Sequence, residues 1–213
     1  MMETKKRNER EIRLCGLELR EASPDQGADN KDDGYYELIG KPIVFSKKTK
    51  LGRNPFTDED VFEVMEPDCF DEADISDVVF NVNHGDGNHA TARTRNGTLQ
   101  LTKKSDGVEC LVKLDKANPR CVQTYIDVKS GLLDRMSFAF TIKEESYDKE
   151  ERCYHVRKIG KIYDVSAVEH PAYEDTSISA RRLESAVAER SRAEALKLDA
   201  EKELLLRKIN RSL

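Results

Sequence analysis

Apolar and polar side chains alternate along much of the chain between residues 12 and 168. A period of two residues is typical of a β-strand with one buried side and one solvent-facing side. The alternation is cleanest where Val108, Cys110, Val112 and Leu114 are separated by polar residues, which is the pattern of an antiparallel strand. Strands are therefore predicted over residues 12–19, 35–45, 60–66, 77–84, 91–94, 98–102, 108–114, 132–142, 154–159 and 161–168.

Turn-forming and polar residues separate these strands. Asn96 and Gly97 form a favourable tight-turn dipeptide, so the strands on either side of it are predicted to pair as a hairpin. Longer polar stretches predict surface loops over residues 23–34, 46–58 and 143–152. The fold class that follows is a β-rich α+β domain with antiparallel strands and a few helices.

One helix is predicted inside this domain. Asn118 is a favourable cap and Pro119 is favourable in the first turn, while Gly131 ends the helix. The apolar stripe of this helix is formed by Val122, Tyr125 and Ile126.

The C-terminal part of the chain predicts a second helix. From about Arg181 onward the sequence is rich in Ala, Leu, Glu, Lys and Arg, with apolar residues at helical spacing, which indicates an amphipathic helix. Either this helix packs against the domain or it forms an exposed, coiled-coil-like arm for a partner. We expect three parts: a flexible start over residues 1–10, a domain over 11–180, and a charged amphipathic helical tail over 181–213.

The composition narrows the class of protein. Of the 213 residues, 38% are hydrophobic and 36% are charged, as in soluble proteins. No apolar run approaches the roughly 20 residues of a membrane-spanning helix, and the N-terminus lacks the apolar segment of a signal peptide, so we expect a cytosolic protein without membrane contact. The formal net charge of -5 argues against a general nucleic-acid binder.

The cysteines carry no disulfide signature. Their number is odd and no two are close in sequence, so they are predicted to be reduced thiols used in packing. They are Cys15, Cys69, Cys110, Cys121 and Cys153.

A single serine interrupts an otherwise apolar strand. Ser137 lies between Met136 and Phe138, although Ser has weak strand propensity and needs a hydrogen-bond partner when it is buried. Two interpretations follow. Either the hydroxyl bonds a neighbouring backbone group, or Ser137 is a nucleophile, which requires a base elsewhere in the chain to take its proton.

Two histidines supply a candidate base and raise the question of a metal site. His84 ends a predicted strand, and His89 follows it with Asp86 between them. The flexible Gly85 and Gly87 do not fix the geometry of ligands, and neither a Cys pair nor a Glu-x-x-His motif completes a ligand set. The same glycines lack the third glycine of a dinucleotide-binding loop. We therefore expect no metal site and no cofactor.

Three short motifs occur in the order His, Ser, acid: Phe80-Asn-Val-Asn-His84, then Lys129-Ser-Gly131 with Asp134-Arg-Met-Ser-Phe-Ala-Phe140, then Asp164-Val-Ser-Ala-Val-Glu-His-Pro-Ala172. In that order they resemble the aromatic-Asn-His element, the Ser-x-Gly-Phe nucleophile strand and the Glu-Val-Ser-x-Val-x-x-Pro-Ala signature of the prohead maturation proteases of tailed bacteriophages. The resemblance covers roughly residues 35–180.

The chain departs from this family pattern at three positions. The family's frequent glycine after the serine is Ala139 here, its usual His-Asp step is His84-Gly85, and its acidic Glu is Asp164. Ala139 is still small, so a close approach of another backbone stays open.

The resemblance implies a single antiparallel, β-barrel-like domain related to the herpesvirus assembly protease. It also implies a serine endopeptidase that cleaves scaffold and major capsid proteins inside the immature prohead, in the cytoplasm of the bacterial host, and then cleaves itself. In that reading Ser137 is the nucleophile, His84 the base and Asp164 the residue that holds His84, and self-association is a further expectation. The alternative is a non-enzymatic capsid scaffold or assembly chaperone with a helical oligomerisation tail.

Three residues compete for the role of third triad member. Asp164 shares a predicted strand face with Ser166, whereas Glu169 lies on the opposite face if the strand continues. His170 comes directly before Pro171, where the strand is predicted to end. The alternation therefore favours Asp164.

Overall fold

The computed structural model describes residues 10–15, 20–21, 34–54, 57–85 and 90–169 of the chain. This part of the chain is mostly β-strand, with one α-helix and two short 3-10 helices. The β-rich class predicted from the alternation of side chains is therefore confirmed.

The strands form two sheets. In the seven-stranded sheet the consecutive neighbours are β1 (Arg10–Cys15), β10 (Arg135–Asp148), β11 (Cys153–Val168), β5 (Asp60–Met65) and β4 (Thr49–Arg53), while β6 (Val79–Val82) pairs with β11 and with β7 (Ala92–Arg93). The four-stranded sheet has the order β2 (Arg20–Glu21), β3 (Tyr35–Val44), β9 (Gly107–Asp115) and β8 (Leu99–Lys104).

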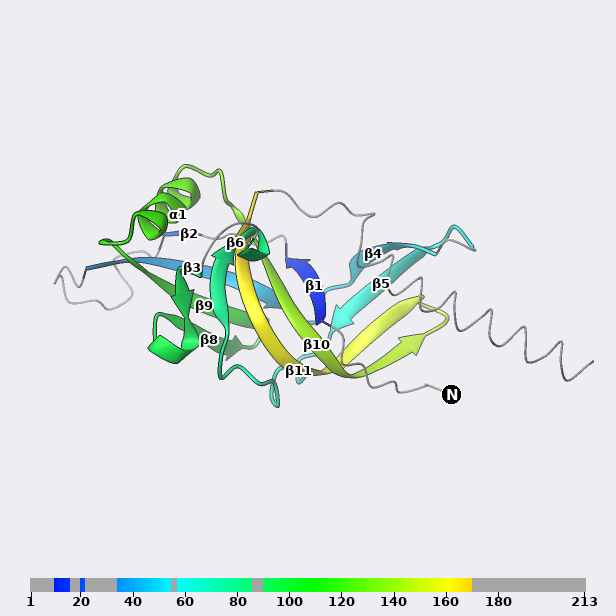
Figure 1. Ribbon diagram of the computed structural model, residues 1–213. Helices are drawn as coiled ribbons and strands as arrows, with labels where there is room; N and C mark the ends of the chain where they lie inside the picture. The colour runs from blue at the N-terminus through cyan, green and yellow to red at the C-terminus, as the bar shows by residue number, and fades with distance from the viewer. Residues whose placement is uncertain (1–9, 16–19, 22–33, 55–56, 86–89, 170–213) are drawn as a thin grey trace, which may run out of the picture.

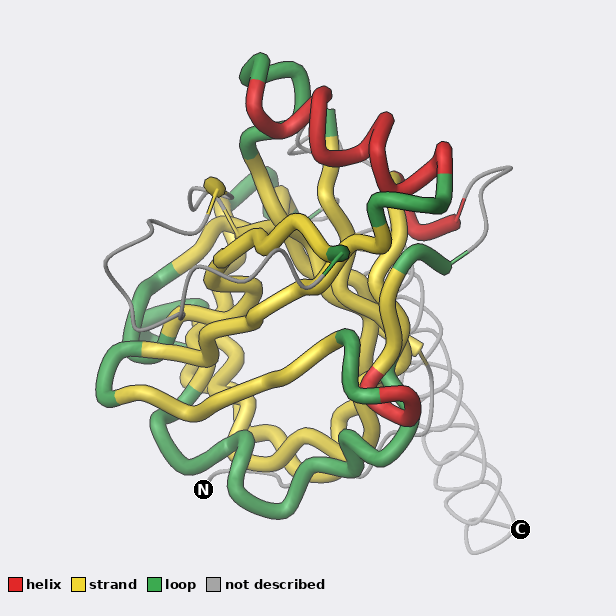
Figure 2. Tube along the Cα trace, turned by 90° about the vertical axis from the view of Figure 1, so that its left-hand side faces the viewer, coloured by secondary structure: helices red, strands yellow, loops and turns green. Residues whose placement is uncertain are grey.

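The long antiparallel pair β10 and β11 runs through the middle of the molecule (Figure 1). The smaller sheet and the helix α1 (Pro119–Lys129) lie on one side of this pair, and β4 with β5 lies on the other. In the view of Figure 2, α1 lies at one end of the strands. The 3-10 helices are η1 (Asn83–Gly85), directly after β6, and η2 (Thr94–Asn96), directly after β7.

Both sheets contribute to one hydrophobic core. The alternating residues Val108, Cys110, Val112 and Leu114 of β9 are fully buried, as predicted. They belong to the same cluster as the phenylalanines of β10 and β6, which are Phe138, Phe140 and Phe80. Because burial of apolar area is the main favourable term in folding, this shared core holds the two sheets together.

The sheets do not close into the barrel that the resemblance implied. Closure requires every edge strand to pair with another strand. Among the described residues β1 pairs only with β10 and β4 only with β5, and no ladder joins the larger sheet to the smaller one. The expectation of a barrel-like sheet is therefore corrected to two separate sheets on a common core.

The hairpin predicted around Asn96-Gly97 is also wrong. β7 pairs with β6 in the larger sheet, and β8 pairs with β9 in the smaller one. Between them the chain forms η2, whose first backbone N–H, of Thr94, donates to Val78 O at 2.9 Å. Gly97 follows with φ 74° as the C-cap. Asn96-Gly97 does lie in a turn, as predicted, but this turn carries the chain from the larger sheet to the smaller one.

Two segments predicted as loops contain strands. β4 lies inside the predicted loop 46–58, where exposed and partly exposed polar residues hide the strand pattern, as is common for an edge strand. β10 continues through most of the predicted loop 143–152, to Asp148, because its polar end pairs with the start of β11. In that extension Glu145 and Ser146 are buried although they are polar.

The helix α1 begins and ends as the sequence indicated. The side chain of Asn118 caps the helix by accepting from Arg120 N at 3.1 Å, and Pro119 occupies the first turn. The buried face differs from the predicted stripe, since Ile126 is 49% exposed. The buried residues of the helix are Cys121, Thr124, Tyr125 and Val128.

Several predictions concern residues outside the described part. These are the loop over 23–33, His89, His170, the helical tail over 181–213 and nearly all of the flexible start over 1–10; the last residue of that start, Arg10, begins β1. Within the described residues, no helix is long and apolar enough to cross a membrane.

Candidate active site

The serine that interrupts the apolar pattern lies in the central part of the larger sheet. Ser137 is fully buried in β10, with Leu14 of β1 and Ser166 of β11 as its two cross-strand neighbours. Its hydroxyl donates to Arg13 O at 2.8 Å, and its Oγ lies 2.6 Å from His84 Nε2. Each of the two interpretations of Ser137 thus corresponds to a contact that is present.

His84 lies in a turn whose backbone has unfavourable dihedral angles. β6 ends at Val82, and the next three residues all have positive φ: 48° at Asn83, 56° at His84 and 78° at Gly85. Side chains other than glycine pay a steric cost in this left-handed region, and such residues concentrate at functional sites. The turn directs the imidazole back over the sheet, where it is 19% exposed.

Asp164 lies on β11, next to the strand that carries the serine. Its side chain is 1% exposed, and its Oδ1 is 2.6 Å from His84 Nδ1. Arg10 of β1 donates to the other oxygen, Oδ2. Burial raises the pKa of the Asp164 carboxyl, but the hydrogen bonds from His84 and Ser166 and the charge of Arg10 outweigh burial and hold the pKa below its usual value.

The three predicted residues therefore form a continuous chain of contacts. Because the carboxylate accepts the proton on His84 Nδ1, the lone pair of Nε2 faces the serine hydroxyl. That arrangement orients one imidazole between an acid that holds it and a hydroxyl whose proton it can accept. The residues come from three separate segments, η1, β10 and β11.

A second layer of polar residues supports Asp164 and His84. Ser166 Oγ lies 2.9 Å from Asp164 Oδ1 and 2.5 Å from Asn81 Oδ1. Both Ser166 and Asn81 are buried, and Ser137, Ser166 and Asn81 are aligned across β10, β11 and β6. Alternation placed Ser166 on the face of Asp164, but no signal in the sequence singled out Asn81 or Arg10.

Of the two rival candidates for the acid, the structure describes Glu169. Glu169 is exposed, and within the described residues its carboxylate accepts only a long contact of 3.5 Å from Asn83 Nδ2. His170, like His89, lies outside the described residues. The part of the chain that the structure describes contains no group of three or more side chains placed to hold a metal ion.

Four cysteines whose side chains the structure describes are not suited to act as nucleophiles. Cys69, Cys110, Cys121 and Cys153 are buried free thiols. Burial raises the pKa of Cys69 and of Cys110 to about 12. Since the thiolate is the reactive form, these groups are unreactive at neutral pH.

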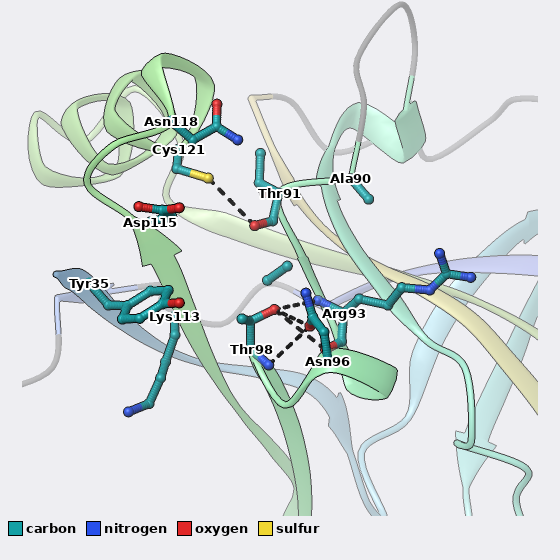
Figure 3. A pocket seen from close by; sticks show the side chains of 11 residues that line it. Tyr35, Ala90, Thr91, Arg93, Asn96, Thr98, Lys113, Asp115, Asn118 and Cys121 are labelled. Carbon is teal, nitrogen blue, oxygen red and sulfur yellow. Dashed lines mark hydrogen bonds between the residues drawn. The ribbon is translucent and has the colours of Figure 1, made fainter. Parts of the chain in front are cut away.

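A cavity of about 330 Å³ lies apart from the three predicted residues. Figure 3 shows it between the segment around Thr91, the strand β9 and the start of α1, with Cys121 Sγ 3.5 Å from Thr91 O at its edge. Its lining is largely polar and includes Arg93 and Asp115. None of His84, Ser137 and Asp164 lines this cavity.

Comparison with known proteins confirms the family that the three motifs resemble. A family model described as caudovirus prohead serine protease matches residues 25–190, which is most of the chain and includes all three predicted site residues. Searches of curated proteins and of solved structures found no match.

Proposed function

The chain belongs to the caudovirus prohead serine protease family, and on that premise we propose that it is the endopeptidase that cleaves scaffold and capsid precursor proteins inside the immature prohead. The observation that supports this most is the chain of two 2.6 Å contacts from Ser137 through His84 to Asp164. In the proposal Ser137 is the nucleophile, His84 the general base and Asp164 the residue that orients it.

The proposed reaction begins at the Ser137 hydroxyl. Oγ attacks the carbonyl carbon of the scissile peptide bond while His84 Nε2 takes the hydroxyl proton. The C–N bond breaks when the imidazolium gives this proton to the leaving amine, and a water molecule then repeats the sequence on the acyl-enzyme. Asp164 stabilises the imidazolium in both halves of the reaction because its carboxylate stays ionised.

The setting of this reaction also belongs to the proposal. The substrates are scaffold and major capsid proteins, the reaction takes place in the assembling capsid in the host cytoplasm, and the enzyme cleaves itself near one or both charged ends. Exposed chain ends are the segments most easily supplied to a protease in extended form. In the proposal, the tail over 181–213, for which the sequence predicts an amphipathic helix, serves as a docking arm for a scaffold or for a second copy. A relationship of fold to the herpesvirus assembly protease is part of the same proposal.

Self-processing offers the direct test. We expect the purified wild type to lose residues from one or both ends, whereas Ser137→Ala and His84→Ala remain folded and full length. The matched control is Ser130→Ala, which removes an exposed hydroxyl that bonds only Asp127 O within the described residues, and it should process like the wild type. Intact mass over time after expression in a clean background measures all four proteins.

Two outcomes would contradict the proposal. If Ser137→Ala yields the same fragments as the wild type, Ser137 is not the nucleophile. If the wild type stays full length and also leaves scaffold and capsid precursors intact, a non-enzymatic scaffold or assembly chaperone describes the chain better.

A further inference from the structure

Asp164 holds one contact that the sequence motifs do not include. Arg10, the first residue of β1, donates from Nη2 to Asp164 Oδ2. The other oxygen, Oδ1, lies 2.6 Å from His84 Nδ1 and 2.9 Å from Ser166 Oγ. Each oxygen of the carboxylate therefore has its own partners, so a rotation of the carboxylate away from His84 would also break the contact with Arg10.

The strand register explains how a residue of β1 reaches across to β11. Ile12, Ala139 and Asp164 are cross-strand neighbours on β1, β10 and β11. Arg10 lies two residues before Ile12 and thus on the same face of the sheet. The intervening strand carries Ala139 at this point, and its single methyl group leaves room for the long arginine side chain. The guanidinium also lies 5.3 Å from the ring centroid of Tyr163, within cation–π distance.

The contact with Arg10 places a positive charge next to the buried carboxylate of Asp164. Asp164 is 1% exposed, and burial without compensation favours the neutral form of a carboxyl group. A neutral Asp164 would accept only a weaker hydrogen bond from His84 Nδ1 and would carry no charge to stabilise an imidazolium. Among the described residues, the charged or titratable groups that contact Asp164 are His84 from η1 and Arg10 from β1. Arg10 is the permanent cation of the two.

We propose that Arg10 is a positioning residue of the catalytic triad, which holds the Asp164 carboxylate aimed at His84, so that the strand β1 completes the active site. The inference rests on the proposed function, because it assigns Arg10 a role in that reaction. The family match begins at residue 25, and β1 ends at Cys15. The proposed contribution thus comes from a part of the chain that the match does not include.

The reactivity of Ser137 can be measured without knowing the substrate. A fluorophosphonate forms a phosphorus–oxygen bond with an activated serine Oγ, fluoride leaves, and the hydroxyl proton passes to the base. We expect Arg10→Ala to slow labelling by roughly 10- to 100-fold, the loss typical of a misplaced catalytic group. Arg10→Lys keeps the charge and should retain most of the rate. The control is Arg93→Ala, which removes another partly exposed Arg–Asp pair, with Asp77, and should label at the wild-type rate.

The pH dependence separates positioning from a general structural role. Burial raises the pKa of the Asp164 carboxyl, while the hydrogen bond and charge of His84, the hydrogen bond from Ser166 and the charge of Arg10 lower it. Removal of Arg10 takes away one of these lowering contributions, so the pKa of Asp164 rises. The acid limb of the labelling rate should therefore move to higher pH in Arg10→Ala and stay in place in Arg10→Lys. If Arg10 contributed only to stability, Arg10→Ala would lower the temperature of the thermal transition, but the pH dependence of the labelling rate would not shift.

The outcomes are distinguishable. A wild type that is not labelled at Ser137 would overturn the proposed function itself. A labelled wild type together with an Arg10→Ala variant of equal rate and equal acid limb would overturn only the role of Arg10. Faster labelling of Arg10→Ala would also overturn it, since Arg10 would then restrain the triad.

Discussion

Ser137 has one hydroxyl proton and two acceptors within reach. His84 Nε2 lies at 2.6 Å and Arg13 O at 2.8 Å, so a neutral imidazole and the backbone carbonyl compete for the same hydrogen. When the proton points to Arg13 O, the hydroxyl is satisfied but not activated; when it points to His84, the arrangement needed for attack is reached. The Ser137 hydroxyl thus has a structural partner in Arg13 O and, in the proposal, a base in His84.

The residue-scale prediction concerns the acid. Asp164→Asn keeps the size of the side chain but removes the negative charge, so His84 is no longer held in the tautomer that leaves Nε2 free. We expect a folded protein whose self-cleavage is slower by roughly 10⁴-fold, the loss known for such a tautomer change. The rate of self-cleavage, followed by intact mass, measures it.

Two variants serve as controls for this assignment. Glu169→Gln and His170→Ala should process almost like the wild type, since Glu169 is exposed and neither is assigned to the triad. If Asp164→Asn stayed active while Glu169→Gln lost activity, the third role would belong to Glu169.

The sequence identified those site residues that lie in short motifs. Ser137 was conspicuous because a hydroxyl in an apolar strand needs a partner, and alternation favoured Asp164 over Glu169. Arg10 and Asn81 were not predicted. Their contacts with the site depend on the strand order β1-β10-β11 and on the pairing of β6 with β11, and the period of a single strand contains no information about its neighbours.

At the scale of elements, the turn η1 is the part that fixes the imidazole. Its residues have positive φ, and a Cβ added to Gly85 would lie 3.4 Å from Asn81 Nδ2. Asn81 in turn contacts Ser166, which contacts Asp164. A change in the turn is therefore transmitted to the triad through two independent routes, the backbone of His84 and the polar layer beneath it.

Gly85→Ala tests this coupling. An L-residue in the left-handed region costs about 1–2 kcal/mol, and the added methyl group would come into van der Waals contact with Asn81. We expect a modest loss of stability but a fall in fluorophosphonate labelling of roughly 10-fold or more, because His84 shifts relative to Ser137. Thermal unfolding and the labelling rate are measured on the same samples.

The control for this variant is Gly97→Ala. Gly97 has a similar φ of 74° but no atom within 4 Å of an added Cβ, and it lies in the turn after η2. It should lose similar stability and label at the wild-type rate. Equal labelling of the two variants would show that η1 does not control the geometry of the site.

The elements that sequence predicted best are those with one buried and one exposed face. β9 alternates cleanly and was predicted almost to the residue, and α1 has its cap in Asn118. β4 was missed because an edge strand needs no apolar face, and the extension of β10 was missed because Glu145 and Ser146 are buried polar residues. The failed hairpin at Asn96-Gly97 shows that a turn dipeptide does not decide which strands pair.

At the scale of the whole molecule, the strand β1 links the active site to the far side of the larger sheet. Arg10 and Arg13 O face the triad, whereas the side chain of Arg13 forms buried ion pairs with Glu63 of β5 and with Glu11. The guanidinium also lies 5.5 Å from the ring centroid of Phe140. Two strands, β10 and β11, separate β1 from β5 in the sheet order. The buried pair therefore fixes the edge strand to the rest of the sheet.

The last prediction follows from the burial of this pair. Arg13→Ala would leave the carboxylates of Glu63 and Glu11, which are 3% and 7% exposed, without their guanidinium. Removing one partner of a buried ion pair costs about 3–5 kcal/mol, because the remaining buried charge loses that compensation. Urea unfolding should show this loss, while Lys143→Ala, which removes an exposed pair with Glu72, should change the free energy of unfolding far less. A folded Arg13→Ala variant should also label more slowly at Ser137, because β1 carries Arg10; equal stability of the two variants would show that the buried pair does not anchor β1.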